Sequence, residues 1–333
     1  MVALSTVRTS NTSLSTHPPP VAIFVGGTSG IGLYTARELA RNTTSPHIYL
    51  IGRSQTSATS VIAELKAINP SSQVSFIQKD ISLLRNVDDA CAEIKRNEKS
   101  VNLLFMTCGY FVFTGRSETP EGLDKKFSLH YYARMRFVDQ LQPLLTAAST
   151  QNQLSRVVAV LDPNQGLRFV PNFADLSLKT TFSLRNCATH ASAMTNLTFA
   201  RLASENKGTA YVHAFPSFVE TGAGRDAWGG LAVLGKPIAW AISKIMEVKP
   251  QESGERHLYA ATSAAFGAQD GEGEKVLGSD GVVGSGSYLV NWNGDILADT
   301  ARAKAMREEG KGDLVREHTE DVFRRICEEG GKY

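Results

Sequence analysis

The chain contains the stretch Val21-Ala-Ile-Phe-Val-Gly-Gly-Thr-Ser-Gly-Ile-Gly32, in which an apolar run leads into closely spaced glycines. Residues 21–25 are all apolar and predict a buried strand, and residues 33–40 repeat apolar side chains with the period of a helix. A glycine turn between a strand and a helix lets the backbone approach a pyrophosphate at the helix N-terminus. This context predicts a nucleotide-binding turn, although a strand-to-helix turn without a ligand is the alternative. The predicted binding residues of the turn are Gly26, Thr28, Ser29, Gly30, Ile31 and Gly32.

Strands and helices alternate along the chain after this turn. Further apolar strands are expected at residues 47–51, 73–77, 101–106, 156–160, 209–215 and 287–290. Helices are expected at residues 60–68, 87–95, 120–148 (with a break at Pro143) and 182–203. Such alternation predicts a doubly wound α/β fold, in which a parallel sheet binds ligands at the carboxyl ends of its strands.

The composition excludes several classes of function. A net charge of +2 over 333 residues gives no reason to expect nucleic acid or an anionic membrane as partner. The four cysteines are widely spaced and form no CxxC pair, which argues against a disulfide framework or a metal site and suits a reducing compartment. No apolar run is long enough to span a membrane, and the N-terminus lacks the apolar core of a signal peptide. We therefore expect a cytoplasmic protein.

The chain is expected to form one domain behind an N-terminal arm. Residues 1–20 are rich in serine and threonine and end in three prolines, which predicts a flexible or surface-draped arm before a domain at residues 21–333. Residues 222–247 open with glycines and then turn apolar, which predicts a lid over a bulky hydrophobic small-molecule substrate. A dimer face or a membrane-surface face is the alternative for this segment, so a homo-oligomer stays open.

The GxxxGxG spacing of the glycine turn resembles that of the short-chain dehydrogenase/reductase (SDR) family, whose loop usually reads TGxxxGxG. Other motifs follow in the family's order as far as about residue 264. The resemblance implies a Rossmann-type SDR fold with a nicotinamide cofactor. Arg53 follows the second strand, where NADP-preferring members often carry an arginine that pairs with the 2′-phosphate. The resemblance therefore implies NADP(H), although a solvated surface arginine is the alternative.

Three further motifs carry the resemblance around the cofactor. Asp80-Ile81 resembles the Asp–hydrophobic pair that holds the adenine. Gly109 matches the last glycine of the family's NNAG motif, although residues 106–108 replace the rest. Residues 216–221 resemble PGxVxT, with Ser217 in place of the glycine. The cofactor-binding residues implied by this last motif are Pro216, Val219 and Thr221, with Thr221 near the nicotinamide carboxamide.

The family's catalytic tetrad is replaced throughout. SDRs use a tyrosine, a lysine four residues later, a serine and an asparagine. The tyrosine position falls on Ala188 and the lysine position on Ser192, while the serine and asparagine positions fall on Asp162 and His130. Residues 181–198 contain no tyrosine or lysine. A methyl group cannot transfer a proton, so the ordinary tyrosine mechanism is excluded.

Two titratable residues remain as candidate catalytic groups. The Asp162 carboxylate could act as acid or base if its pKa is raised, or it could cap the turn that follows it. His130 could shuttle protons, or it could be a packed or solvent-facing histidine in a charged helical stripe with Lys126 and Arg134. His190 points about 200° away from the tyrosine position around the helix and is expected to be structural.

Three stretches near the C-terminus, at residues 252–262, 284–288 and 317–323, resemble a subgroup of SDRs that is frequent in fungal biosynthetic gene clusters. This resemblance implies an atypical NADP(H)-dependent oxidoreductase of specialised (secondary) metabolism, acting on a bulky hydrophobic natural-product intermediate without a tyrosine. Two alternatives remain: a non-redox isomerase or cyclase that reuses the pocket, and a catalytically silent NADP-binding protein.

Overall fold

The computed structural model describes residues 1–109, 114–219 and 247–333. Its centre is a seven-stranded sheet in the order β3-β2-β1-β4-β5-β6-β9, and every neighbouring pair of strands is parallel. The strands are β1 (Val21–Val25), β2 (His47–Gly52), β3 (Gln73–Gln78), β4 (Leu103–Met106), β5 (Arg156–Val160), β6 (Ala210–Ala214) and β9 (Ser287–Val290). The strand order reverses between β1 and β4, which confirms the doubly wound fold and places the switch point beside the glycine turn.

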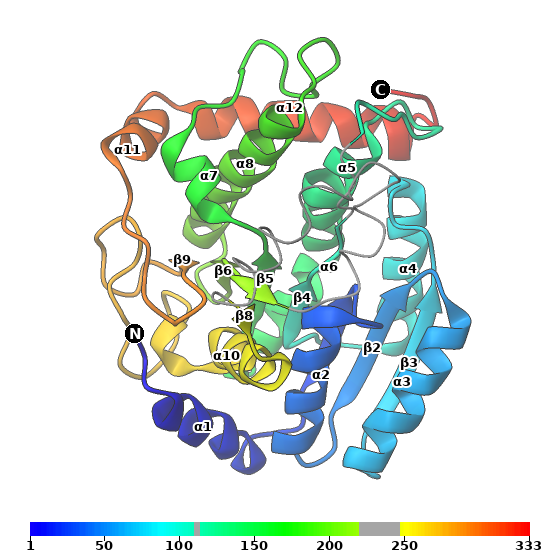
Figure 1. The fold of residues 1–333 in the computed structure, drawn as a ribbon, viewed down its shortest axis with the longest axis vertical. Helices are drawn as coiled ribbons and strands as arrows, with labels where there is room; N and C mark the ends of the chain where they lie inside the picture. The colour runs from blue at the N-terminus through cyan, green and yellow to red at the C-terminus, as the bar shows by residue number, and fades with distance from the viewer. Residues whose placement is uncertain (110–113, 220–246) are drawn as a thin grey trace, which may run out of the picture.

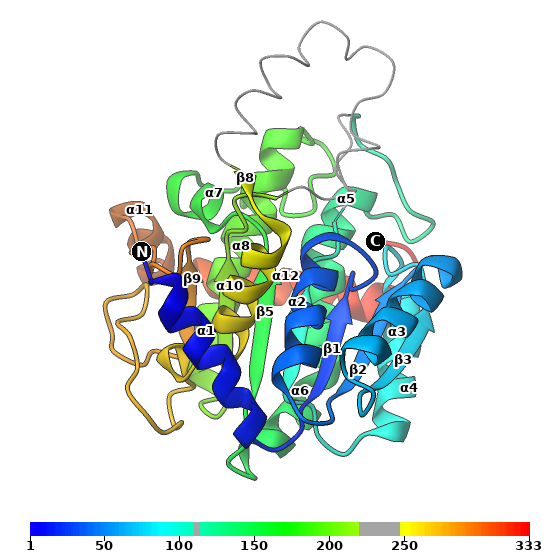
Figure 2. The same cartoon turned by 60° about the horizontal axis from the view of Figure 1, so that its bottom comes forward.

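Helices cover both faces of the sheet (Figures 1 and 2). One face carries α2 (Gly30–Asn42), α3 (Gln55–Ile68) and α10 (Pro250–Thr262). The other face carries α4 (Leu84–Asn97), α6 (Ala133–Ser149) and α8 (Leu184–Glu205), with α12 (Lys311–Phe323) packed outside α8. Alternate residues of β1 enter the two cores, Ala22 and Phe24 on one face and Ile23 and Val25 on the other.

Short elements complete the described chain. They are η1 (Leu14–Thr16), α5 (Lys125–Phe127), η2 (Ser128–Tyr132), α7 (Pro163–Arg168), β7 (Phe218–Val219), β8 (Glu247–Val248), η4 (Ala264–Phe266), α11 (Ala301–Glu308) and η5 (Arg324–Glu328). Strands β7 and β8 pair in parallel. The predicted lid at residues 222–247 lies outside the described residues except for Glu247.

The N-terminal arm contains a helix, α1 (Leu4–Ser13), that lies across α10 (Figure 2). Val7 is buried in the core, and the Asn11 side-chain amide donates to the backbone oxygen of Glu255 at 2.8 Å. This stretch is therefore anchored on the domain surface.

The expected break at Pro143 is wrong, because α6 continues through this residue to Ser149. Pro143 cannot donate to the carbonyl of Asp139, but both residues are exposed, so water can satisfy that oxygen. The expected start of the same helix is also wrong, since the helical turns begin at Lys125. None of the helices in the described part of the chain is long and apolar enough to cross a membrane.

Candidate functional site

The glycine turn between β1 and α2 adopts a backbone that only glycine accepts readily. Gly26 has φ +91° and Gly30 has φ +55°, both in the left-handed region. Ser29 is the N-cap residue of α2, but its side chain accepts no hydrogen bond from the helix, and the first turn carries no acidic residue. The N-terminal amides of α2 are therefore left without a side-chain cap, as a phosphate-binding helix requires.

Gly32 brings helix α2 against the turn that precedes it. A Cβ atom at Gly32 would lie 2.6 Å from the backbone oxygen of Gly26 and 2.7 Å from Oγ1 of Thr107. Thr107 itself follows β4 and donates its hydroxyl proton to the Gly26 oxygen at 3.2 Å. Because Gly32 has no side chain, α2 can pack closely against both the turn and the end of β4.

Arg53 and Asp80 follow two adjacent strands, β2 and β3, at the same edge of the sheet. Arg53 is exposed, whereas Asp80 is half-buried and accepts hydrogen bonds from the backbone (3.1 Å) and hydroxyl (2.8 Å) of Ser82. Burial alone would raise the pKa of Asp80, but the Ser82 hydrogen bonds and the charges of Lys125 and Arg53 outweigh it and lower the pKa. The edge therefore carries an ionised acceptor next to an exposed guanidinium.

The remaining predicted cofactor residues lie at the same side of the sheet, apart from Thr221, which is outside the described residues. Gly109 is exposed just after β4, and Pro216 and Val219 are half-buried after β6. Ile81 is buried in the core beneath Asp80. Ser217, which replaces a family glycine, has φ +59°, so the chain keeps a glycine-like backbone here with a residue that rarely adopts it.

Helix α8 presents no proton-transferring group at the tyrosine and lysine positions. Ala188 is half-buried, and its methyl group carries no proton to exchange. Ser192 is buried, and its hydroxyl donates to the backbone oxygen of Asp162 at 2.6 Å. The residue at the lysine position therefore ties α8 to the chain that leaves β5.

The Asp162 carboxylate caps the short helix α7. Its Oδ1 accepts from the backbone and side-chain nitrogens of Asn164, both at 3.0 Å, and its Oδ2 accepts from Nε2 of Gln165 at 3.3 Å. This geometry favours the capping alternative over a free acid or base. The residue still lies at the carboxyl end of β5, where a ligand of such a sheet binds.

His130 is buried rather than solvent-facing, together with Lys126 and Arg134 of the same predicted stripe. Burial, and then the positive charges of Arg134 and Lys126, lower the pKa of His130 to about 3. A histidine with this pKa is neutral at pH 7, so it cannot donate a proton from an imidazolium.

Sequence reasoning did not identify the role of Arg134, which is 1% exposed. Its Nη1 donates to the oxygen of Val160 at 2.9 Å, and its Nη2 donates to the oxygen of Cys108 at 2.6 Å. Its Nε donates to the oxygen of Leu129 at 3.3 Å. One guanidinium thus holds the ends of β4 and β5 together beside the switch point.

His190 is structural, as expected from its helical position. Its Nε2 accepts from the backbone nitrogen of Asn172 at 3.0 Å, and its Nδ1 lies 2.8 Å from the oxygen of Asn186. The ring therefore fastens the segment before α8 to the first turns of that helix.

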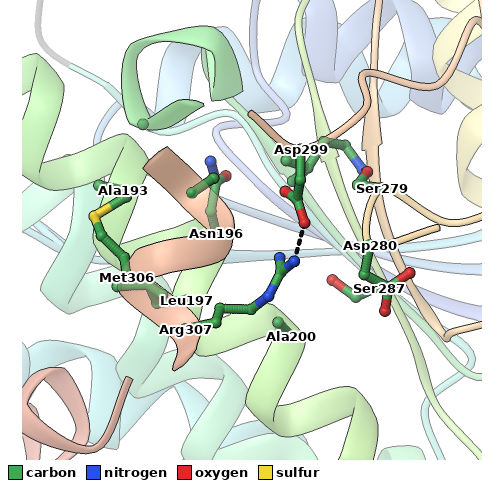
Figure 3. A pocket seen from close by; sticks show the side chains of 13 residues that line it. Ala193, Asn196, Leu197, Ala200, Ser279, Asp280, Ser287, Asp299, Met306 and Arg307 are labelled. Atoms are coloured by element: carbon green, nitrogen blue, oxygen red, sulfur yellow. Dashed lines mark hydrogen bonds and ion pairs between the residues drawn. The ribbon is translucent and has the colours of Figure 1, made fainter. Parts of the chain in front are cut away.

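A separate small pocket lies between α8, α11 and β9 (Figure 3). Asn196, Met306 and the ion-paired Asp299 and Arg307 line it. Of the predicted site residues that the structure describes, none lines this pocket. Among the described residues there is no group of His, Cys, Asp and Glu side chains that could hold a metal ion.

Comparison with known proteins agrees with this architecture. Residues 20–160 match the family described as short chain dehydrogenase. The chain is 40% identical to Oxidoreductase AN1596 of Emericella nidulans, over 97% of this chain and 98% of that protein. It is 30% identical to Short-chain dehydrogenase/reductase SAT2 of Stachybotrys chartarum, over 89% of each chain. The NADPH-bound carbonyl reductase from chicken fatty liver shares the fold, with a TM-score of 0.55 and 17% identity over 84% of this chain and 99% of that one.

The chain therefore belongs to the short-chain dehydrogenase/reductase family, which confirms the resemblance seen in its motifs. Within that family it is an enzyme of the oxidoreductase class.

Proposed function

We propose that the chain is an atypical NADP(H)-dependent oxidoreductase of specialised metabolism, acting on a bulky hydrophobic intermediate without the tyrosine–lysine pair. The observation that supports it most is the glycine turn, where the N-terminal amides of α2 lack a side-chain cap and Arg53 stands exposed after the neighbouring strand. The α2 amides would bind a diphosphate, and the Arg53 guanidinium would bind a 2′-phosphate.

The residues at the sheet edge fit such a cofactor. The amides of α2 would hold the diphosphate, Arg53 the 2′-phosphate, and Asp80 the adenine. The residues after β4 and β6, among them Gly109 and Pro216, would border the nicotinamide. Bound NADPH supplies a hydride in this family of enzymes. No acidic side chain occupies the first turn of α2, so no carboxylate there opposes the phosphates.

The chain's own groups offer little acid catalysis at the reacting end. Ala188 has no exchangeable side-chain proton, and the hydroxyl of Ser192 donates a hydrogen bond to the backbone oxygen of Asp162. The proton can come from a protein side chain, which would be Asp162 or His130, or it can come from the solvent or the substrate. Because the Asp162 carboxylate is held by three donors and His130 is neutral, we favour a substrate such as an iminium or enone that needs little acid help.

A non-redox isomerase or cyclase is the second candidate, and the Ser192–Asp162 hydrogen bond favours it. This bond uses the polar group at the lysine position for structure. The site would then act by orienting the substrate and would have no side chain dedicated to proton donation.

One experiment separates the two candidates. The protein is incubated with candidate intermediates, with and without NADPH, while the reduced-nicotinamide absorbance and the product mass are followed. Stoichiometric consumption of NADPH identifies a reductase. Turnover at constant substrate mass, with NADP⁺ or without cofactor, identifies an isomerase or cyclase. A wild-type chain with no affinity for either nicotinamide cofactor would contradict the proposal.

A further inference from the structure

A hollow of about 410 Å³ lies beyond the catalytic positions, on the side of the sheet where the strands end. Residues 114–116, which follow β4, form one wall, and residues 179, 180 and 182–184, at and before the start of α8, form the other. Its volume falls in the range of small-molecule sites, about 300–1,000 Å³. None of the described residues assigned above to the cofactor or to catalysis lines it.

The hollow reaches the first residue of α8, one helical turn before the tyrosine position. Leu184 lines it and stands four residues before Ala188, so the two side chains share one face of the helix. One helical turn spans about 5.4 Å. A substrate whose reactive carbon lies beside Ala188 therefore reaches the hollow with its next few atoms.

The described lining contains two cations, Arg116 and Lys179, and no acidic residue. A third cation, Lys126, stands behind the wall and is 2% exposed. Its ammonium donates to the oxygen of Gly115 at 3.0 Å and to Oγ1 of Thr114 at 3.4 Å. Lys126 and Lys179 thus add positive charge to the same small space, while the charge of Arg116 is offset by its ion pair with Glu118.

Nearby carboxylates are already engaged. Glu118 forms an ion pair with Arg116. Asp175 accepts hydrogen bonds from the backbone nitrogens and hydroxyls of residues 179–181 at 2.8–2.9 Å. In the described part of the chain Lys179 forms no direct ion pair and its side chain is exposed, although its positive charge also acts on the Glu118 carboxylate and helps lower the pKa of that group. Lys179 is therefore the charge that remains to meet a ligand.

The start of α8 adds to the positive potential. Ser183 and Leu184 line the hollow as the N-cap and first residue of this 22-residue helix, whose first turn carries no acidic residue. The Ser183 hydroxyl already accepts from the backbone nitrogen of Asn186 at 3.0 Å, so the contribution of this end is the helix dipole. Apolar surface is present as well, since Phe182 lines the hollow and Leu184 is 39% exposed. The lining combines an apolar patch with an exposed lysine that forms no direct ion pair with the described residues, which suits an amphiphilic anion.

We propose that this hollow binds an acidic group, a carboxylate or an acidic enol, carried by the hydrophobic substrate. Lys179 is the main charge partner, and Arg116 and the N-terminus of α8 assist it. The identity of this ligand as the substrate rests on the proposed function, because it places the reactive carbon of the same molecule beside Ala188.

A matched pair of fluorescent probes tests whether the hollow prefers an anionic ligand. The probe 8-anilino-1-naphthalenesulfonate carries an anionic group on an apolar body, and N-phenyl-1-naphthylamine is the same body without the sulfonate. Both are titrated against the full chain and its Lys179→Gln variant. The sulfonate probe should lose about fivefold in affinity in this variant, as expected for a partly solvated ion pair, and the neutral probe should be unchanged. Added salt should weaken only the sulfonate probe.

Two variants locate the effect. Lys66→Gln removes an exposed lysine on α3, at the far end of the sheet, and should change neither probe. Leu184→Gln removes apolar surface from the hollow and should weaken both probes. Circular dichroism confirms that each variant is folded.

The proposal is overturned if the sulfonate probe binds wild type and Lys179→Gln equally, if both probes weaken together in that variant, or if Lys66→Gln has the same effect. NADPH affinity is measured on the same samples. Loss of probe discrimination with intact NADPH binding refutes the acidic subsite alone. Absent NADPH binding with intact probe discrimination refutes the proposed function and leaves the anion site standing.

Discussion

The hydroxyl of Ser192 donates to the backbone oxygen of Asp162 across 2.6 Å, and this bond joins helix α8 to the chain leaving β5. Asp162 in turn caps α7 with its carboxylate. Two of the four positions that the family devotes to proton transfer are therefore used here to hold helices in place. A reaction at this site must obtain its proton differently from that of an ordinary family member.

The cofactor preference depends on Arg53. We expect Arg53→Ala to lose NADPH affinity at least tenfold, because a charge-assisted contact contributes about 1.5–3 kcal/mol, while NADH affinity hardly changes. Calorimetric titration of both cofactors measures this. Equal affinity of the wild type for NADPH and NADH would contradict the assignment.

Gly32 controls the packing of α2 on the glycine turn. In Gly32→Ala the new Cβ would lie 2.6 Å from the Gly26 oxygen, so α2 must move away from the turn. We expect NADPH affinity to fall about tenfold or more, with a folded circular dichroism spectrum. Gly312→Ala is the matched control, because a Cβ at Gly312 meets no atom within 4 Å. Retained binding in Gly32→Ala would mean that the turn does not hold the cofactor.

Asp162 can be tested apart from its capping role. Asparagine also caps helices, so Asp162→Asn should keep the fold, and it should lower turnover by about 10²–10⁴ if the carboxylate is the acid or base. Asp162→Ala should cost about 0.5–2 kcal/mol of stability through the lost cap of α7. Steady-state kinetics and urea unfolding measure the two effects. Wild-type turnover in Asp162→Asn would eliminate the carboxylate and leave His130 or a substrate-supplied proton.

Buried histidines should make the fold sensitive to acid. Burial lowers the pKa of His130 and His213 to about 3, and that of His257 and His318 to about 4. Each folded-state pKa lies below the unfolded value of about 6.5, so the unfolded chain binds more protons as the pH falls. Stability is therefore complete above pH 6.5 and decreases progressively below it.

Urea unfolding at pH 7.5 and pH 5 measures this loss, and NMR follows the ring protons of the four histidines. Their resonances should not titrate between pH 8 and pH 5. A His130 resonance that titrates near pH 6.5 would restore this residue as a proton shuttle.

Asp175 organises the wall of the hollow. Burial raises its pKa, but the backbone and hydroxyl hydrogen bonds from Thr180 and Thr181 outweigh this and lower the pKa. Because the folded-state pKa is lowered, the stabilisation is present above about pH 4 and is lost as the pH falls below it. Asp175→Asn should destabilise the fold by roughly 1–3 kcal/mol at pH 7, since one amide oxygen replaces two carboxylate oxygens.

The same variant should also weaken the sulfonate probe, because residues 179–181 lose their common acceptor. The exposed Asp270→Asn is the control and should change neither stability nor probe binding. Unchanged stability of Asp175→Asn at pH 7 would contradict this role.

Helix boundaries show where local sequence stops being informative. Helix α3 begins five residues before the expected position, at Gln55, where the side chain of Ser54 accepts from the backbone nitrogen of Ser57. Helix α4 begins at Leu84, whose amide donates to the carboxylate of Glu121 at 2.6 Å. The first cap is readable from neighbouring residues, whereas the second comes from 37 residues away.

The sequence by itself determined the order of strands and helices and the glycine turn, and it predicts the loss of the tyrosine–lysine pair. These features depend on local period, on backbone freedom at Gly26 and Gly30, and on residue identity at Ala188 and Ser192. The assignments of individual cofactor and catalytic residues stay predictions.

Tertiary structure alone decided where charges lie and what holds them. The sequence left open whether the stripe of Lys126, His130 and Arg134 is packed or solvent-facing, and the structure buries all three side chains. Arg134 of α6 donates to the chain at the ends of β4 and β5, whereas Lys126 of α5 donates to residues 114 and 115. The Ser192–Asp162 bond and the cationic hollow likewise join segments far apart in the chain. Burial and hydrogen-bond partners are set by such through-space contacts, and periodicity along the sequence carries no information about them.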